Sequence, residues 1–453
     1  MAYLGSTPET QSFTSGTDYF NGDGISVAFT LSRPVASVND IEVVVSNVVQ
    51  QPSTAYTVSG TTITFTSAPP TGTANVYARY LSTVTQTITP SPGTVGTSQL
   101  SPSLTNIPFF GGSTLGAGNA TGMKNRIING GMVIDQRNAG ASVTPTDGQY
   151  VIDRWKQYQS VASKYSVQQN AGGVTPPAGF ANYLGVVSLS SYTSSSADYF
   201  TLEQTIEGYN VADLGWGTAD AKSVTVSFWV RSSLTGTFGG SIKNKSSSAD
   251  RSYPFSFVIS VANTWERKTI TVIGDTTGIW LNTNGLGITL SINLGTGTTY
   301  SGPAGAWAAS NYLSATGATS VVGTSGATFY ITGVQLEEGN AATSFDFRDY
   351  GRELMMCQRY YYSMPSMPNY PAFHYNSSAY TSVILPVTMR TTPTVTANNI
   401  GGSYYEGGGT YSFTVASFVG NSTQSVSLQV NVSGGTSGFA GTFNPVFQAS
   451  AEL

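Results

Sequence analysis

The sequence predicts an all-β protein built from several domains. At about 100–200 residues per domain, 453 residues correspond to two to four domains. Short runs of alternating apolar and polar residues recur along the chain, and loops rich in Gly, Ser and Thr separate them. A hydrophobic content of 40%, with 12% aromatic residues, is enough for packed cores and argues against disorder.

The N-terminal part, residues 1–81, is predicted to form a small β-sandwich. The segment ANVYARY (74–80) alternates between two faces, and turn residues interrupt the apolar runs every 8–12 positions, as is typical of short antiparallel strands. Residues 82–124 are rich in Pro, Gly, Ser and Thr and are predicted to form a neck or linker. The run IPFF (107–110) is the one apolar patch in that segment.

Residues 125–346 contain all six tryptophans and are predicted to form one large jelly-roll or sandwich. The clearest strand is KSVTVSFWVR (222–231), where Val224, Val226, Phe228 and Val230 share one face. Further strands are predicted at 268–274, 286–294 and 327–336.

A connecting helix is predicted within 347–363, because Tyr350, Leu354, Cys357 and Tyr361 follow the spacing of one helical stripe over residues 349–363. Residues 364–453 return to short strands at 382–387, 392–397, 410–418 and 425–432, and are predicted to form a distal β domain.

The composition is poor in the side chains that perform catalysis. The chain has one histidine, one cysteine and 9% charged residues, whereas soluble domains average about 25%. Enzymes place titratable groups in clefts, so the composition favours a structural or recognition protein over an enzyme. The net charge of -4 and the lack of basic runs disfavour nucleic acid as a partner.

The sequence also bears on the compartment of synthesis and on bound groups. The start, MAYLGSTPETQ, has neither the positive nor the apolar region of a signal peptide, and no stretch reaches the roughly 18 apolar residues of a membrane span. A lone cysteine excludes an internal disulfide framework. We therefore expect synthesis in a reducing cytoplasm, no membrane insertion, no cofactor and no metal.

Acidic residues at three places of the sequence are candidates for metal binding or catalysis. The sequence Asn21-Gly22-Asp23-Gly24 is either a β-turn or a calcium ligand set, and the Glu that ends an EF-hand loop is missing. Adjacent Glu337 and Glu338 on a strand point to opposite faces and would not converge on one glycosidic bond. On a helix, Glu203 and Glu207 would share a face, but strand-like runs flank them, so polysaccharide cleavage is the weaker interpretation.

His374 and Cys357 are the rarest reactive side chains of the chain. No GxSxG motif accompanies His374, and no second histidine is available for a metal, so it is either packed among aromatic residues or part of a binding loop. Cys357 is expected to be a buried, inert thiol.

Aromatic side chains are the main candidates for binding. The C–H faces of sugars lie against aromatic rings, and loops on a rigid β scaffold commonly carry binding residues. For each ring, the alternative is a place in a small core or in a contact between subunits. Trp216 and Trp307 lie in Gly-rich loops and are expected to be more exposed than Trp229. The candidate receptor-binding residues are Tyr370, Phe373, His374, Tyr375, Tyr380, Tyr404, Tyr405, Tyr411, Trp216 and Trp307.

Three stretches resemble bacteriophage tail-fibre sequences. FNGDGISVAFTLS (20–32) with AYTVSGTTITFTSAPPTG (55–72) resembles the N-terminal attachment domain of short-tailed phage fibres. KNRIINGGMVIDQRN (124–138) with YVIDRW (150–155), and FYITGVQLEEGNAATSFDFRDYGRELMMCQRYY (329–361), are similar to the opening and closing strands of a phage-type jelly-roll module.

The resemblance implies a homotrimeric fibre in the virion. Residues 1–81 would attach to a tail adaptor or to tail proteins near the portal, and residues 364–453 would form the receptor-binding tip. The 125–346 jelly-roll would be similar in type to carbohydrate-binding modules. The expected partner is host lipopolysaccharide or another surface glycan. Two alternatives remain open: a fibre-borne polysaccharide depolymerase and a purely structural tail protein.

Overall fold

The computed structural model describes residues 16–81, 123–244, 249–364, 370–397, 401–443 and 446–453. The chain divides into two compact units, Met1–Phe110 and Gly111–Leu453, which are described separately. Apart from positions 123 and 124, the predicted neck lies outside the described residues. Strands make up most of the regular structure, so the predicted all-β fold class is confirmed.

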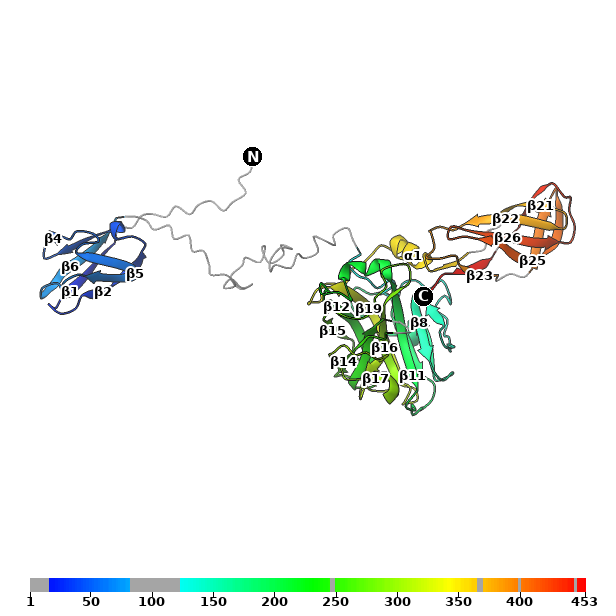
Figure 1. Ribbon diagram of the computed structural model, residues 1–453, viewed down its shortest axis with the longest axis horizontal. Helices are drawn as coiled ribbons and strands as arrows, with labels where there is room; N and C mark the ends of the chain where they lie inside the picture. The colour runs from blue at the N-terminus through cyan, green and yellow to red at the C-terminus, as the bar shows by residue number, and fades with distance from the viewer. Residues whose placement is uncertain (1–15, 82–122, 245–248, 365–369, 398–400, 444–445) are drawn as a thin grey trace. The chain divides into compact units, whose positions relative to one another are not determined.

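The N-terminal unit contains two antiparallel sheets around one core (Figure 1). A four-stranded sheet has the order β1-β6-β3-β4, and a second sheet pairs β2 with β5. The predicted alternation in β6 is confirmed, because Val76, Ala78 and Tyr80 are buried and Arg79 is exposed. The strands are β1 (Thr17–Gly22), β2 (Ala28–Val35), β3 (Ile41–Val45), β4 (Val48–Val49), β5 (Tyr56–Phe65) and β6 (Gly72–Tyr80).

The jelly-roll consists of a five-stranded sheet, β15-β12-β19-β10-β9, and a six-stranded sheet, β14-β13-β16-β11-β8-β7. Both sheets contribute to one core (Figure 1). The strands are β7 (Tyr150–Ile152), β8 (Trp155–Gln159), β9 (Tyr165–Gln169), β10 (Leu184–Ser188), β11 (Tyr199–Glu207), β12 (Val224–Ser232), β13 (Gly236–Lys243), β14 (Ser252–Ile259), β15 (Glu266–Val272), β16 (Leu286–Thr296), β17 (Ser301–Gly302), β18 (Ser314–Ala315) and β19 (Thr328–Glu338).

Strand β12 follows the predicted pattern. Val224, Val226, Phe228 and Val230 are fully buried in the core between the sheets. Trp229, on the opposite face, is half-buried. Full burial of such side chains stabilises a fold by about 1.5–3 kcal/mol each.

The predicted helix is shorter than expected. Helix α1 spans Tyr350–Gln358, and the Asp349 side chain caps it by accepting a hydrogen bond from the Arg352 N–H. The prediction that the helix continues to residue 363 is wrong, because Tyr361–Ser363 form strand β20. In β20, Tyr361 pairs with Ser450, a contact too distant in the sequence for helical spacing to indicate.

The stripe predicted on this helix is buried only in its C-terminal half. Cys357 is fully buried, and burial raises the pKa of its thiol, whereas Tyr350 is exposed. In the described part of the chain, no helix is long and apolar enough to cross a membrane.

The C-terminal strands form a closed barrel in the order β21-β22-β26-β25-β24-β27 and a three-stranded sheet, β20-β28-β23 (Figure 1). Alternate side chains fill the barrel interior, including Val383, Val426, Leu428 and Phe443. The strands are β21 (Tyr370–Tyr375), β22 (Ser378–Ile384), β23 (Thr394–Ala397), β24 (Gly401–Glu406), β25 (Gly409–Asn421), β26 (Ser425–Val432), β27 (Ala440–Phe443) and β28 (Phe447–Ser450).

The last residues of the chain contact the jelly-roll. Glu452 forms ion pairs with Arg137, at 2.6 Å, and with Arg154, whose side chain is 1% exposed. The Tyr150 hydroxyl donates to the Leu453 carbonyl at 2.7 Å. Arg390, from the segment between β22 and β23, donates to the carbonyls of residues 451 and 452. The C-terminus therefore joins the barrel segment to the jelly-roll.

We predict that Glu452→Ala strongly destabilises the protein. The change leaves the buried Arg154 guanidinium without its carboxylate, and breaking a buried pair costs about 3–5 kcal/mol. The matched control is Glu338→Ala, which removes an exposed pair with Lys222 and should cost less than about 1 kcal/mol. Denaturant unfolding of both full-length variants measures the difference, and equal losses would contradict the prediction.

Candidate ligand-binding site on the C-terminal barrel

Strand β21 places aromatic side chains on the outside of the barrel. Successive side chains of a strand point to opposite faces, so Ala372 and His374 are buried while Phe373 and Tyr375 are 51% and 56% exposed. The adjacent strand β22 continues the pattern, because Tyr380 is exposed and pairs directly with Phe373. Directly opposed residues on one face of a sheet lie about 4.5–5.5 Å apart at Cβ.

One more exposed ring lies on the same outer side of the barrel, two strands away from β21. Tyr405 of β24 pairs with Thr442 of β27, which in turn pairs with Pro371 of β21. We call this surface the aromatic face; its residues are Phe373, Tyr375, Tyr380 and Tyr405. Phe439 is also exposed, but it lies in the loop before β27 and not on a strand of the barrel.

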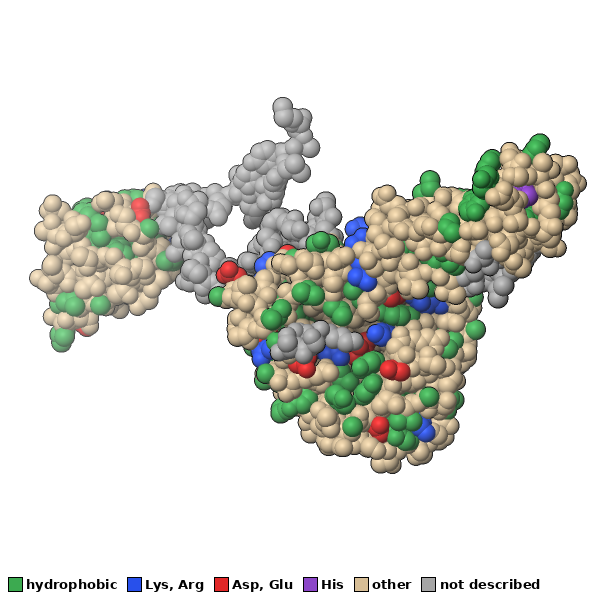
Figure 2. All heavy atoms as spheres, turned by 45° about the vertical axis from the view of Figure 1, so that its right-hand side comes forward, with side chains coloured by type: hydrophobic (Ala, Val, Ile, Leu, Met, Phe, Trp, Pro, Cys, Tyr) green, Lys and Arg blue, Asp and Glu red, His purple; other side chains and the backbone are tan. Residues whose placement is uncertain are grey.

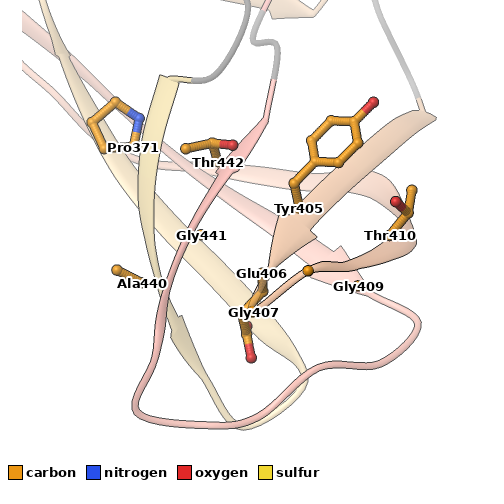
Figure 3. A pocket seen from close by; sticks show the side chains of 10 residues that line it. Pro371, Tyr405, Glu406, Gly407, Gly409, Thr410, Ala440, Gly441 and Thr442 are labelled. Atoms are coloured by element: carbon orange, nitrogen blue, oxygen red, sulfur yellow. The ribbon is translucent and has the colours of Figure 1, made fainter.

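A shallow depression of about 410 Å³ opens beside Tyr405. Figure 3 shows Pro371 on β21 and Tyr405 on β24, on either side of the β27 segment that carries Gly441 and Thr442. The remaining lining residues are Glu406, Gly407, Gly408, Gly409, Thr410 and Ala440. The depression therefore combines one exposed ring with hydroxyl groups and a glycine-rich turn.

A polar contact inside the barrel supports this turn. His374 Nδ1 lies 2.8 Å from Glu406 Oε2, and the Thr436 N–H donates to Glu406 Oε1 at 2.5 Å. The Tyr404 ring packs edge-on against His374 with centroids 5.6 Å apart. A side chain at Gly441 would overlap the Tyr404 ring, so glycine is required there.

The buried environment changes the pKa values of two of these groups. Burial raises the pKa of Glu406, but hydrogen bonds from the Thr436 N–H and from His374 outweigh it and hold that pKa below its ordinary value. Burial raises the pKa of Tyr404 to about 12, and the neighbouring Glu406 contributes to the rise. Glu406 is therefore an anion at neutral pH, and its charge is turned toward the barrel interior.

The structure separates the ten candidate residues into exposed and buried groups. Phe373, Tyr375, Tyr380 and Tyr405 lie together on the aromatic face. Tyr370 and Tyr411 are half-buried, and Tyr411 packs against an interior cluster. His374 and Tyr404 are buried, so the interpretation of His374 as packed among aromatic residues fits its position and direct contact with a receptor does not.

The tryptophans of the jelly-roll loops pack against each other. Trp216, Trp280 and Trp307 form edge-to-face contacts with centroids 4.7–5.5 Å apart. The expectation that Trp216 is more exposed than Trp229 is wrong, because Trp216 is 8% exposed and its indole N–H donates to the Lys222 carbonyl. The adjacent Gly217, at φ +85°, lies close to the Gly278 carbonyl, which a Cβ at this position would approach to 2.9 Å. Trp307 is half-buried.

The acidic candidates each have an internal partner. Glu203 pairs with Lys243 at 3.1 Å, and Glu207 pairs with Arg359 at 2.6 Å. Glu337 accepts hydrogen bonds from Thr343, and Glu338 pairs with Lys222.

The Asp23 segment behaves as a turn. Hydrogen bonds from Ser26 and Ile25 to its carboxylate lower the pKa of Asp23 to about 2. Within the described ranges, no group of three or more His, Cys, Asp or Glu side chains is placed to hold a metal.

Comparison with known proteins gives weak structural similarities. No family model matches the sequence, and no curated protein matches it. The enzymatically active domain of tailspike protein 4 from bacteriophage CBA120 is 12% identical with a TM-score of 0.26, covering 48% of this chain and 22% of that chain. The protein thus spans about a fifth of that tailspike chain.

Two sugar-binding structures are similar to the same degree. A putative sugar binding protein from Bacteroides thetaiotaomicron is 13% identical with a TM-score of 0.28, covering 48% of this chain and all of that one. TmCBM61 in complex with β-1,4-galactotriose is 13% identical with a TM-score of 0.25, covering 48% and 99%. TM-scores this low do not support an inference about the function of this protein.

We predict that ionised Glu406 stabilises the barrel in a pH-dependent manner. A carboxylate whose pKa is lowered by folding contributes stability above its unfolded pKa of about 4.5, and the contribution is lost as the pH falls through the folded pKa. Unfolding free energies of the wild type and Glu406→Gln should therefore converge as the pH falls below about 4.5. Glu338→Gln, at an exposed pair, is the control. A wild-type-to-Gln difference that stays constant over this range would disprove the role of the charge.

Proposed function

We propose that the protein is a phage tail fibre that adheres to a bacterial surface glycan through the aromatic face of its C-terminal barrel, without catalysing a reaction. The single observation that supports this most is the gathering of Phe373, Tyr375, Tyr380 and Tyr405 on one outward surface. Large exposed apolar patches on a soluble protein mark interaction sites. Single exposed rings would need no such explanation.

Aromatic rings of this kind suit a saccharide ligand. A tyrosine combines an apolar ring, which covers the C–H face of a sugar, with a hydroxyl that can hydrogen-bond at its edge. Tyr and Phe side chains have only two χ angles, so little conformational entropy is lost when they are immobilised by a ligand. A rigid barrel that holds the rings in fixed positions lowers the cost of binding further.

The N-terminal unit has features expected of an attachment domain. Ile25 is 83% exposed, and Val48 and Val49 are exposed on β4, the edge strand of the four-stranded sheet. An exposed apolar edge strand is a ready surface for pairing with another protein. We propose that a tail adaptor or a tail protein near the portal covers it in the virion, and that the chain is made in the host cytoplasm.

Weak individual contacts are sufficient for adsorption when several act together. In a trimer, three barrels would present three copies of the aromatic face. Linking binding sites in this way raises the overall avidity by about 10²–10⁴ over a single site. Each contact can therefore remain weak and reversible.

We predict that the aromatic face carries glycan binding. The double substitution Phe373→Ser and Tyr375→Ser should weaken binding about tenfold or more, because buried aromatic anchors dominate interface energies. Binding of the full-length protein to a panel of immobilised bacterial capsular and lipopolysaccharide glycans provides the measurement. The control is Val258→Ser with Val261→Ser, two exposed apolar positions on the jelly-roll.

The same glycan panel also distinguishes adhesion from the two alternative functions. Reducing ends released from any glycan in the panel would identify a depolymerase instead of a fibre that only binds. Unchanged adsorption to host cells after the double substitution at Phe373 and Tyr375 would favour a purely structural tail protein.

We also predict that the purified chain is a homotrimer. The jelly-roll exposes Tyr209, Ile279 and Leu281, apolar side chains that a contact between copies would cover. Sedimentation equilibrium should give three times the mass of one chain, with the far-UV spectrum of the folded protein as the control. A monomer at micromolar concentration would contradict the trimer.

A further inference from the structure

The barrel segment carries almost no charge. From residue 364 to the C-terminus, the sequence has three charged residues, Arg390, Glu406 and Glu452, together with His374. In Figure 2, the visible surface of the barrel's outer end consists of green and tan atoms with a small purple histidine patch, and no blue or red atoms are seen there. A surface of 90 residues at the average composition of soluble domains would carry about a quarter charged residues.

Each of these charged groups is engaged in an internal contact. Glu406 is buried and contacts His374, at 2.8 Å. Glu452 pairs with Arg137 and Arg154 of the jelly-roll. Arg390 donates to three backbone carbonyls, those of residues 284, 451 and 452. The aromatic face therefore has no charged side chain of its own segment with which to meet a charged ligand.

Apart from the Glu406 carboxylate, which is already bonded to His374 and to the Thr436 N–H, the residues lining the depression beside Tyr405 are uncharged. Its volume of about 410 Å³ lies within the range of about 300–1,000 Å³ that is usual for small-molecule sites. Tyr405, 43% exposed, supplies a ring at one side, and Thr410 supplies a hydroxyl group. Figure 3 shows the Glu406 side chain next to the turn at Gly407, on a different side of its strand from the Tyr405 ring.

The glycine turn leaves space for a ligand to approach the backbone. Gly407 and Gly408 have φ values of +56° and +83°, which glycine adopts without strain. A Cβ built at either position would meet no atom within 4 Å, so the space above the turn is open. Peptide groups in such a turn are available to hydrogen-bond the hydroxyl groups of a ligand.

We propose that this depression binds an uncharged saccharide unit, with its C–H face against the Tyr405 ring and its hydroxyls toward Thr410 and the turn at Gly407–Gly409. The proposal rests on the proposed function and specifies its ligand class. An anionic sugar would lose hydration at a site whose segment has no free cation to compensate, and that desolvation is unfavourable. An extended protein partner would need about 1,000 Å² of matching surface, whereas the depression fits one or two sugar rings.

Three full-length variants test the site. Tyr405→Ala should weaken binding to neutral polysaccharides at least tenfold, while Tyr405→Phe, which keeps the ring, should remain within about threefold of the wild type. The matched control is Tyr19→Ala, a tyrosine of similar or greater exposure in the N-terminal unit. Circular dichroism melting of each variant ensures that binding is compared between folded proteins.

The ligand class is tested with glycans sorted by charge. The probes are neutral bacterial polysaccharides and, separately, polysaccharides rich in uronic acid, sialic acid or phosphate. Binding to the neutral set should change little between about 50 mM and 1 M NaCl, since no ion pair is formed that salt would screen.

The outcomes separate this inference from the proposed function. Binding confined to anionic glycans, or lost at high salt, would overturn the inference and leave glycan adhesion intact. Equal binding by Tyr405→Ala and Tyr19→Ala would exclude the depression as the site. A change in sedimentation mass of Tyr405→Ala would assign the depression to a subunit contact instead. Failure of the wild type to bind any glycan would overturn both proposals.

Discussion

The scarcity of charged side chains constrains the rest of this structure. Several of the charges of the jelly-roll and the barrel are placed in buried pairs, such as Glu203 with Lys243 and Glu452 with Arg154. Buried pairs contribute little net stability relative to apolar packing, but removal of one partner is costly, so they fix geometry more than they add free energy. Because the charges of the barrel segment are paired internally, the outer surface of the barrel presents hydroxyl, amide and aromatic groups. These groups determine which ligands the barrel can bind.

The two-residue period of the strands links the barrel interior to its surface. In β21, the register that buries His374 beside Glu406 also exposes Phe373 and Tyr375. A shift of one residue would reverse both sets, so the internal polar contact and the aromatic face depend on the same register. The packing of Tyr404 over Gly441 fixes β24 against β27 and thereby the position of Tyr405 on the outer side.

The sequence predicted features that depend on neighbouring residues and missed features that depend on contacts between distant residues. The alternation in β12 and β6 was recovered because a strand with one buried face must alternate. The end of α1 was missed because pairing of Tyr361 with Ser450 overrides the helical spacing. The burial of Trp216 was missed because its flanking glycines indicate an exposed loop, whereas Gly217 lies against the Gly278 carbonyl and Trp216 packs on Trp280. The pairing of His374 with Glu406, 32 residues away, has no local signature at all.

The distribution of acids supports the proposal that the protein adheres to a glycan and does not cleave it. A glycosidase needs two carboxyl groups about 5–10 Å apart across a cleft, and one of them must exchange a proton with the substrate. Glu203, Glu207 and Glu406 each contact an internal partner, so their carboxylates already hold structural contacts. Freeing any of them would break a contact that positions a strand. The rings of the aromatic face, in contrast, contribute little to the core. A ligand can therefore cover them without any rearrangement of the barrel.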